Sequence, residues 1–306
     1  MNDDARGLAQ PPERAAALMH ASLAGLSVGD AFGDQFFLLA NRRLTAADLP
    51  PPPWEWSDDT EMACSVVACL HDHGRVDQDV LATSFATRMD TGRRYGAGAL
   101  ELLERIRDGH PWRAASAGSF GGNGSFGNGA AMRVAPLGAY YTGDPARAAA
   151  EAALQAEITH AHTEGIAGAV AVAVAASLAA TGTAGDLIEA ALDHVPGTYV
   201  RQGLQRARGL AKATPEEAAQ ALGNGSRITA QDTVPFALWA ATRHLGDYPA
   251  GVRACVTAGG DMDTTAAIVG GIIATRTGID GIPPDWLDAR EPLPAWVKDH
   301  PTARRS

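Results

Sequence analysis

The sequence has 306 residues, 46% of them hydrophobic, and a formal net charge of −10 at pH 7. This composition suffices for a sizeable core, and the length still permits one large domain. The negative charge argues against a nucleic-acid backbone or an anionic membrane as the main partner, but not against a small anionic ligand in a local pocket. The three cysteines, Cys64, Cys69 and Cys255, lack metal-site spacing. We therefore expect reduced thiols in a cytoplasmic protein.

No segment has the pattern of a membrane or export sequence. The N-terminal stretch "MNDDARGLAQPPE" has no basic region followed by an apolar one, so it does not resemble a signal peptide. The longest apolar run, 166–180, is short and dominated by alanine, which indicates a buried helix. We therefore expect no membrane partner.

Helical patterns dominate from one end of the chain to the other. Apolar residues recur at helical spacing in two early segments, and three alanine-rich stretches favour helix by propensity. Strand-like alternation and repeats of fixed period are hard to find. In chain order these signals are Met19, Leu23 and Leu26; Met62, Val66 and Cys69; and the stretches 146–156, 166–180 and 236–242.

These patterns predict a compact all-α protein of about a dozen helices, each near the common length. We expect a single domain over 12–300, a disordered tail at 1–11 and a loose end at 301–306. No feature indicates a second domain, and a monomer is expected.

Five polar stretches interrupt the helical pattern. "GDAFGDQFF" (29–37) ends an apparent helix in glycines, around Asp30 and Asp34. "WSDDTEM" (56–62) starts a helix, and on its own Ser57 or Asp58 as N-cap, with Glu61 in a capping box, explains it well.

The other three stretches lie further along the chain. The glycine-rich "SAGSFGGNGSFGNGAAMR" (116–133) leads into a helix and can present backbone N–H groups to phosphate, although it could also be a flexible connection. "ITHAHTEG" (158–165) carries His160 and His162, and single histidines are often structural. "AGGDMDTTAAIVGGIIA" (258–274) places two aspartates at the start of an apolar helix.

The second and fifth stretches together supply only oxygen ligands. Hard oxygen donors suit magnesium, calcium or manganese, and not zinc or copper. Two divalent ions would be neutralised by the four carboxylates, whose burial would otherwise be costly. The candidate ligands are Ser57, Asp58, Asp59, Asp261, Asp263 and Thr264.

Five motifs in this order resemble the ADP-ribosylglycohydrolase family. They are "GDAFG", "WSDDTEM", "GNGAAMRVAPLG", "THAHTEGIAGAVAVA" and "GGDMDTTAAIVGGIIA", within a resemblance that covers roughly 14–290. The resemblance implies an all-α orthogonal bundle, in agreement with the helical patterns. It also implies that the six candidate ligands hold two Mg²⁺ ions (or Mn²⁺), with Asp59 and Asp263 the best placed to touch both.

The resemblance also implies a substrate site for ADP-ribose or an ADP-ribosylated molecule. The glycine-rich loop would cradle the diphosphate and proximal ribose, Phe126 or Phe120 would face adenine, and His160 would line the cleft, whereas His162 is expected to be structural. The implied loop residues are Gly124, Ser125, Phe126, Gly127, Asn128 and Gly129.

The sequence departs from the family at one position. Many members carry a glutamate four residues after the last glycine of the first motif, where it can touch a metal and gate the cleft. Here that position is Phe37, so either Asp34 takes over this role or the gate is absent.

The implied reaction is hydrolysis of the glycosidic bond at C1″ of ADP-ribose. Metal ions would orient the ribose hydroxyls and lower the pKa of the attacking water, and Asp58 or Asp59 would accept its proton. Asp90 would hold the guanidinium of an arginine acceptor, unless it pairs with Arg93 or Arg94 or caps a helix. The alternatives are a hydrolase of free derivatives such as O-acetyl-ADP-ribose, and an ADP-ribose-binding protein without turnover.

Overall fold

The computed structural model describes residues 13–181 and 184–297, and these contain sixteen α-helices and no β-strand. The prediction of an all-α fold is confirmed, whereas the expected dozen helices was too few. Glycine and proline cut the middle of the chain into pieces of four and six residues, α6 (Gly129–Met132) and α7 (Ala135–Tyr140). The tails predicted at 1–11 and 301–306 lie outside the described residues.

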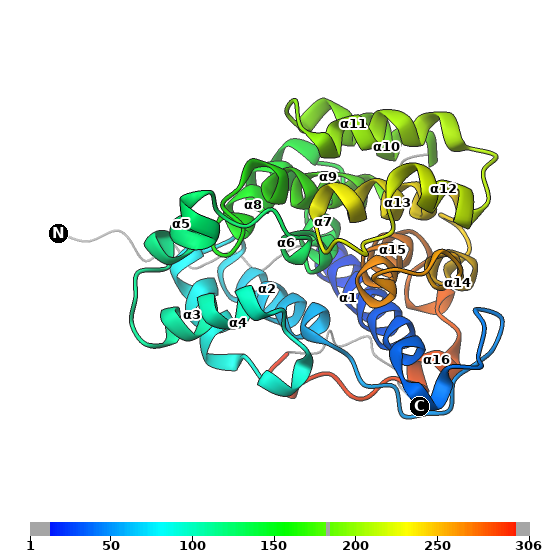
Figure 1. Ribbon diagram of the computed structural model, residues 1–306, viewed down its shortest axis with the longest axis horizontal. Coiled ribbons are helices and arrows are strands. Elements are labelled where there is room, and N and C mark those ends of the chain that lie inside the picture. The colour runs from blue at the N-terminus through cyan, green and yellow to red at the C-terminus, as the bar shows by residue number, and fades with distance from the viewer. Residues whose placement is uncertain (1–12, 182–183, 298–306) are drawn as a thin grey trace.

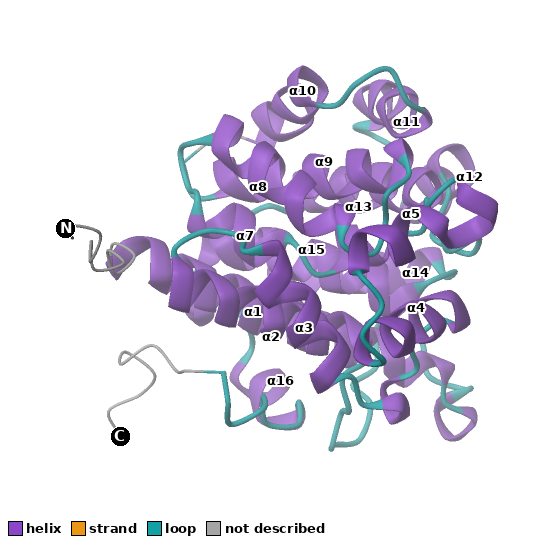
Figure 2. Cartoon of the chain, turned by 90° about the vertical axis from the view of Figure 1, so that its left-hand side faces the viewer, coloured by secondary structure: helices purple, strands orange, loops and turns teal. Residues whose placement is uncertain are grey.

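The helices follow one another through short connections, and Figures 1 and 2 show them packed around a few central members. The remaining α-helices are α1 (Glu13–Asp34), α2 (Asp58–His73), α3 (Gln78–Arg88), α4 (Ala97–Arg107), α5 (Trp112–Gly122), α8 (Pro145–Glu157), α9 (Thr163–Ala179), α10 (Ala184–His194), α11 (Tyr199–Ala207), α12 (Pro215–Leu222), α13 (Ala230–Arg243), α14 (Tyr248–Ala258), α15 (Met262–Thr277) and α16 (Pro284–Ala289).

The centre of the fold is the antiparallel pair α1 and α15, which lie against each other in Figure 1. Three glycines of α1 face the backbone of α15 so closely that no side chain fits between them. A Cβ atom would lie 2.4 Å from the carbonyl oxygen of Gly270 if built on Gly25, and 2.2 Å from that of Ala266 if built on Gly29. This close approach brings the end of α1 to the start of α15.

Burial explains the apolar character of the longest helices. The helical stretch Glu13–Phe37 could cross a membrane by length and composition alone, but 78% of its most apolar window is buried inside the protein. Its packing against α15 accounts for that character without a membrane. The run predicted as a buried helix is α9, whose side chains are almost all buried.

Candidate functional site

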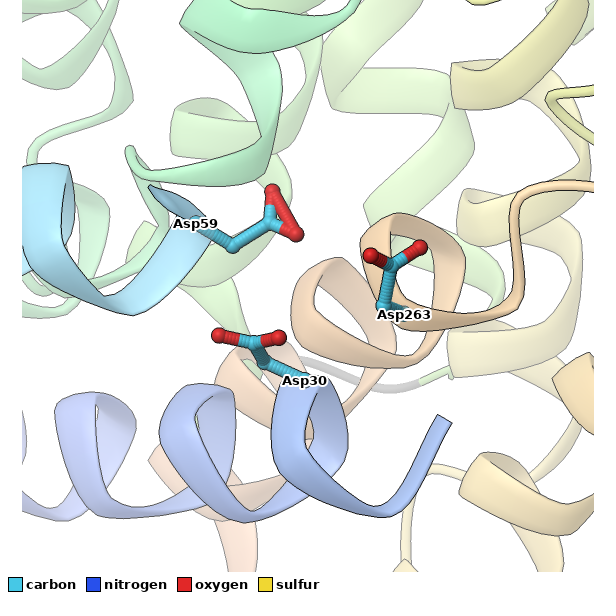
Figure 3. Close-up of side chains that lie close together, drawn as sticks. All are labelled: Asp30, Asp59 and Asp263. Atoms are coloured by element: carbon cyan, nitrogen blue, oxygen red, sulfur yellow. The ribbon is translucent and has the colours of Figure 1, made fainter. Parts of the chain in front are cut away.

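Three aspartates from three helices meet at the junction of α1, α2 and α15. Asp30, Asp59 and Asp263 each place one carboxylate oxygen so that the three oxygens lie within 4.8 Å of one another. Figure 3 shows the three side chains pointing toward a common point from their separate helices. The family resemblance paired Asp59 with Asp263 but implied no role for Asp30, which lies in the "GDAFG" motif.

Hydrogen bonds hold Asp30 against the start of α2. Its carboxylate accepts from the backbone N–H of Ser57 at 2.9 Å and of Thr60 at 3.1 Å, and from the Thr60 hydroxyl at 2.5 Å. Asp30 thus satisfies N–H groups that the first turn of a helix leaves without partners. It also ties α1 to α2 beside the cluster.

Asp59 is held from two sides. The hydroxyls of Ser57 and Thr264 lie 3.2 and 3.3 Å from a carboxylate oxygen of Asp59. The two residues predicted as neutral metal ligands therefore contact a carboxylate that was also predicted as a metal ligand. Ser57 is also the N-cap of α2, because its hydroxyl accepts from the N–H of Asp59. The capping box expected with Glu61 is wrong: Thr60 occupies the third helical position, and Glu61 accepts from the hydroxyl of Tyr95 at 2.6 Å.

Burial and mutual repulsion make it unfavourable for all of these aspartates to be ionised together. Burial, together with the charge of Asp263, raises the pKa of Asp30 to about 6. Burial, together with Asp261, raises the pKa of Asp263 to about 7, and burial raises the pKa values of Asp58 and Asp59 well above the usual range. Each carboxylate disfavours the ionisation of the others.

A divalent cation fits this arrangement. Within residues 13–181 and 184–297, no ion pair includes any of the five aspartates, although buried carboxylates need compensating positive charge. The donors are all oxygens, as magnesium and manganese prefer. The five aspartates are Asp30, Asp58, Asp59, Asp261 and Asp263.

The cluster borders a cavity of about 480 Å³. Eleven of the residues proposed from the sequence line it, whereas Ser57, Asp59 and Gly124 do not. The eleven are Asp58, Phe120, Ser125, Phe126, Gly127, Asn128, Gly129, His160, Asp261, Asp263 and Thr264. The cavity is also lined by residues to which no role was assigned from the sequence, among them Arg94, Arg133, Arg227, Ile228 and Thr229. Of these five, only Arg133 lies within a quoted stretch.

Residues 125–129 of the glycine-rich stretch form one wall of this cavity, which we call the glycine wall. Gly124 has a positive φ of 71°, and a Cβ atom built on it would lie 2.7 Å from the backbone nitrogen of His162. Gly129 faces the ring of His160, where a Cβ atom would lie 2.8 Å from Cε1. Glycine at these positions therefore lets the stretch pack closely against the segment that carries His160 and His162.

Aromatic rings stand at the edge of the same wall. The rings of Phe120 and Phe126 have centroids 6.2 Å apart, and the two residues are 59% and 38% exposed. Exposed aromatic faces of this kind can pack against a flat heterocycle. Phe120 has an unfavourable positive φ of 52°, in a kink at the end of α5.

His160 is buried beneath the glycine wall. Its Nδ1 lies 2.7 Å from the hydroxyl of Thr159, and burial, together with the nearby Arg133, lowers its pKa to about 3. The ring is therefore neutral near pH 7, and it contacts the cavity as a hydrogen-bonding group. His162 is the N-cap of α9, because its ring accepts from the N–H of Glu164.

Asp34 and Asp90 lie outside the cavity lining. Asp34, the last residue of α1, is buried and forms an ion pair with Arg94. Asp90 caps the 3₁₀ turn η3 (Thr91–Arg93) by accepting from Gly92, and lies 3.8 Å from Arg93. The alternative for Asp90 was that it pairs with a nearby arginine or caps a helix, and these contacts agree with that alternative. They give no support to a contact between Asp90 and an arginine acceptor.

A second cavity, of about 580 Å³, adjoins the first through Arg227 and Thr229. Asp232 is the sole acidic residue of its described lining, and that carboxylate accepts from the backbone N–H of Arg227. The smaller cavity is therefore the better candidate for chemistry, since it alone reaches the carboxylate cluster.

An all-α fold with an oxygen-only donor cluster at the end of a glycine-walled cavity defines a helical protein with a candidate divalent-cation site. The family model described as ADP-ribosylglycohydrolase matches residues 11–304. The chain belongs to this family, so the resemblance inferred from the five motifs is confirmed.

Relatives and a solved structure agree with this assignment. The chain is 29% identical to "ADP-ribosylhydrolase ARH3" of Bos taurus, over 91% of this chain and 90% of that one. It is 25% identical to "ADP-ribosylarginine hydrolase Tri1" of Pseudomonas putida, over 90% and 75%. A solved "ADP-ribosylglycohydrolase-related protein complex" has a TM-score of 0.68 at 25% identity, covering 92% of this chain and 94% of that one.

Proposed function

We propose that the protein is a metal-dependent hydrolase that cleaves the glycosidic bond between ADP-ribose and an acceptor. The observation that carries this proposal is the buried carboxylate cluster beside the cavity, with no cation paired to it among the described residues. The relatives named as ADP-ribosyl hydrolases support the substrate class. Buried carboxylates cost stability, which favours a functional role for the cluster over a structural one.

The proposed metal ligands form two groups, according to whether their carboxylate oxygens meet in the cluster. Asp30, Asp59 and Asp263 would form the inner set, and Asp58, Asp261, Ser57 and Thr264 would complete the sites for two Mg²⁺ ions (or Mn²⁺). When bound, these ions supply positive charge that orients ribose hydroxyls and lowers the pKa of water. Asp261 already accepts a hydrogen bond of 2.7 Å from Asn128, which links the ligand set to the glycine wall.

Asp58 is a better candidate than Asp59 for accepting the proton from water. Asp58 lines the cavity, whereas Asp59 is 1% exposed and its carboxylate already accepts from two hydroxyls. A general base has to reach the attacking water, so a position in the cavity lining supports Asp58 for this role. The glycine wall would hold the diphosphate through backbone N–H groups, and Phe120 or Phe126 would face adenine.

The direct test measures free ADP-ribose released from defined ADP-ribosylated peptides and from O-acetyl-ADP-ribose. We expect release with Mg²⁺ or Mn²⁺ and its loss after chelation. Tight binding of ADP-ribose without release from any substrate would identify a binding protein. Release that persists after complete metal removal would refute metal dependence.

Gly127→Val is expected to weaken ADP-ribose binding by at least about tenfold. A Cβ atom at this position would lie 3.2 Å from Nε2 of His160 and 3.3 Å from the Ser125 hydroxyl, and the larger valine would fill the cavity wall. Isothermal titration calorimetry measures the loss. The Mg²⁺-dependent shift in melting temperature should persist, because Gly127 does not contact the carboxylates.

Gly209→Val is the matched control, since a Cβ atom there meets no atom within 4 Å. Its ADP-ribose affinity should equal that of the wild type. An unchanged affinity in Gly127→Val would remove the glycine wall from the proposed phosphate site.

A further inference from the structure

Arg94 brings a positive charge to the carboxylate end of the cavity. It lines the cavity together with Asp58 and Asp263, and its Nε lies 2.9 Å from a carboxylate oxygen of Asp34. Asp34 lies one helical turn after Asp30, and a Cβ atom on the intervening Gly33 would lie 2.7 Å from Cα of Asp263. The Arg94–Asp34 pair is therefore next to the proposed metal site.

The backbone around Arg94 is fixed by its neighbours. Arg94 has a φ of 64°, a left-handed conformation that non-glycine residues rarely adopt. The guanidinium of Arg93 stacks 3.4 Å from the ring centroid of Trp56 and pairs with Glu291. On the other side, Tyr95 donates to Glu61 at 2.6 Å.

Asp34 fixes the side chain in turn. This carboxylate is only 2% exposed, and Arg94 is its one ion-pair partner among the described residues. The Arg94 side chain remains 41% exposed, and the residue lines the cavity. A fixed backbone and a buried carboxyl partner together hold the Arg94 side chain at the carboxylate end of the cavity.

We propose that Arg94, held by Asp34, determines acceptor specificity by rejecting a guanidinium-linked acceptor and admitting a neutral, oxygen-linked one. This inference rests on the proposed hydrolase function. A guanidinium is recognised by a carboxylate that accepts two parallel hydrogen bonds. Asp34 is already occupied by Arg94, and the cluster aspartates would be occupied by metal ions. An arginine acceptor would therefore meet like charge without a free carboxylate.

The test compares kcat/KM for matched peptides that carry ADP-ribose on serine or on arginine. The wild type should favour the serine linkage. Arg94→Glu should shift the ratio toward the arginine linkage by at least about tenfold, because it replaces repulsion with an acceptor carboxylate. Arg94→Lys should keep the wild-type preference, since the positive charge remains. Arg43→Glu, an equal charge change at an exposed residue outside the cavity, should leave the ratio unchanged.

The outcomes separate this inference from the proposed function. Hydrolysis by the wild type with an unchanged ratio in Arg94→Glu, or a wild-type preference for the arginine linkage, would overturn the specificity role alone. Release from neither linkage nor from O-acetyl-ADP-ribose would overturn both. Thermal unfolding shows whether each variant folds. If Arg94→Glu does not fold, the ratio of kcat/KM for the two linkages is compared between the wild type and Arg94→Gln, which removes only the charge.

Discussion

Asp263→Asn is expected to lower kcat by at least about 100-fold, which is the loss that even indirect partners of metal ligands can cause. The change removes one negative charge from the ligand set and almost no volume. The same variant should have a higher melting temperature than the wild type when both are metal-free at pH 8. Assays of ADP-ribose release and differential scanning calorimetry with chelator measure the two effects.

The stability effect has a defined sign. Burial raises the pKa of Asp263 from 3.8 to about 7, so the folded state holds a proton that the unfolded state has lost. This group therefore costs stability increasingly as pH rises from about 4, and the cost is complete above pH 7. Asparagine carries no charge at any of these pH values, so it avoids that cost.

Asp288→Asn provides the control, because Asp288 is exposed on α16 and lies away from the cavity. It should change neither kcat nor the melting temperature. Full activity of Asp263→Asn after strict removal of residual metal would contradict a role for the cluster in catalysis. A lower metal-free melting temperature would show that Asp263 stabilises the fold through its carboxylate.

Gly29→Val is expected to lower the free energy of unfolding by about 3 kcal/mol, the upper part of the range for overpacked cores. A Cβ atom on Gly29 would lie 2.2 Å from the carbonyl oxygen of Ala266 and 2.7 Å from its carbonyl carbon. These are backbone atoms of α15, so the two helices must move apart. Urea unfolding monitored by circular dichroism measures the change.

The separation should also weaken metal binding, since Asp30 on α1 and Asp263 on α15 would move apart. Gly246→Val, at a position with no atom within 4 Å of a Cβ, should be neutral in both measurements. Wild-type stability of Gly29→Val would mean that the α1–α15 pair tolerates a wider spacing than the structure shows.

The helical class could be predicted from sequence patterns and is confirmed, and the same patterns predicted eleven residues that line the cavity. Helical spacing of Met19, Leu23 and Leu26 predicted the buried face of α1, and all three are buried. Local signals identified the starts of α2 and α15, because capping and helix-start preferences depend on neighbouring residues only. The oxygen-rich motifs at these starts predicted the kind of ion, since ligand chemistry follows residue type.

The pairing of Asp59 with Asp263 followed from the family resemblance, whereas the place of Asp30 in the cluster is visible only in the three-dimensional fold. Asp30 joins the cluster because Gly25, Gly29 and Gly33 let α1 approach α15, and this contact links residues more than 200 positions apart. The pairing of Asp34 with Arg94 likewise depends on the turn after α3 folding back onto the end of α1. Local sequence signals carry no information about such distant contacts, because burial and close packing arise from the whole fold.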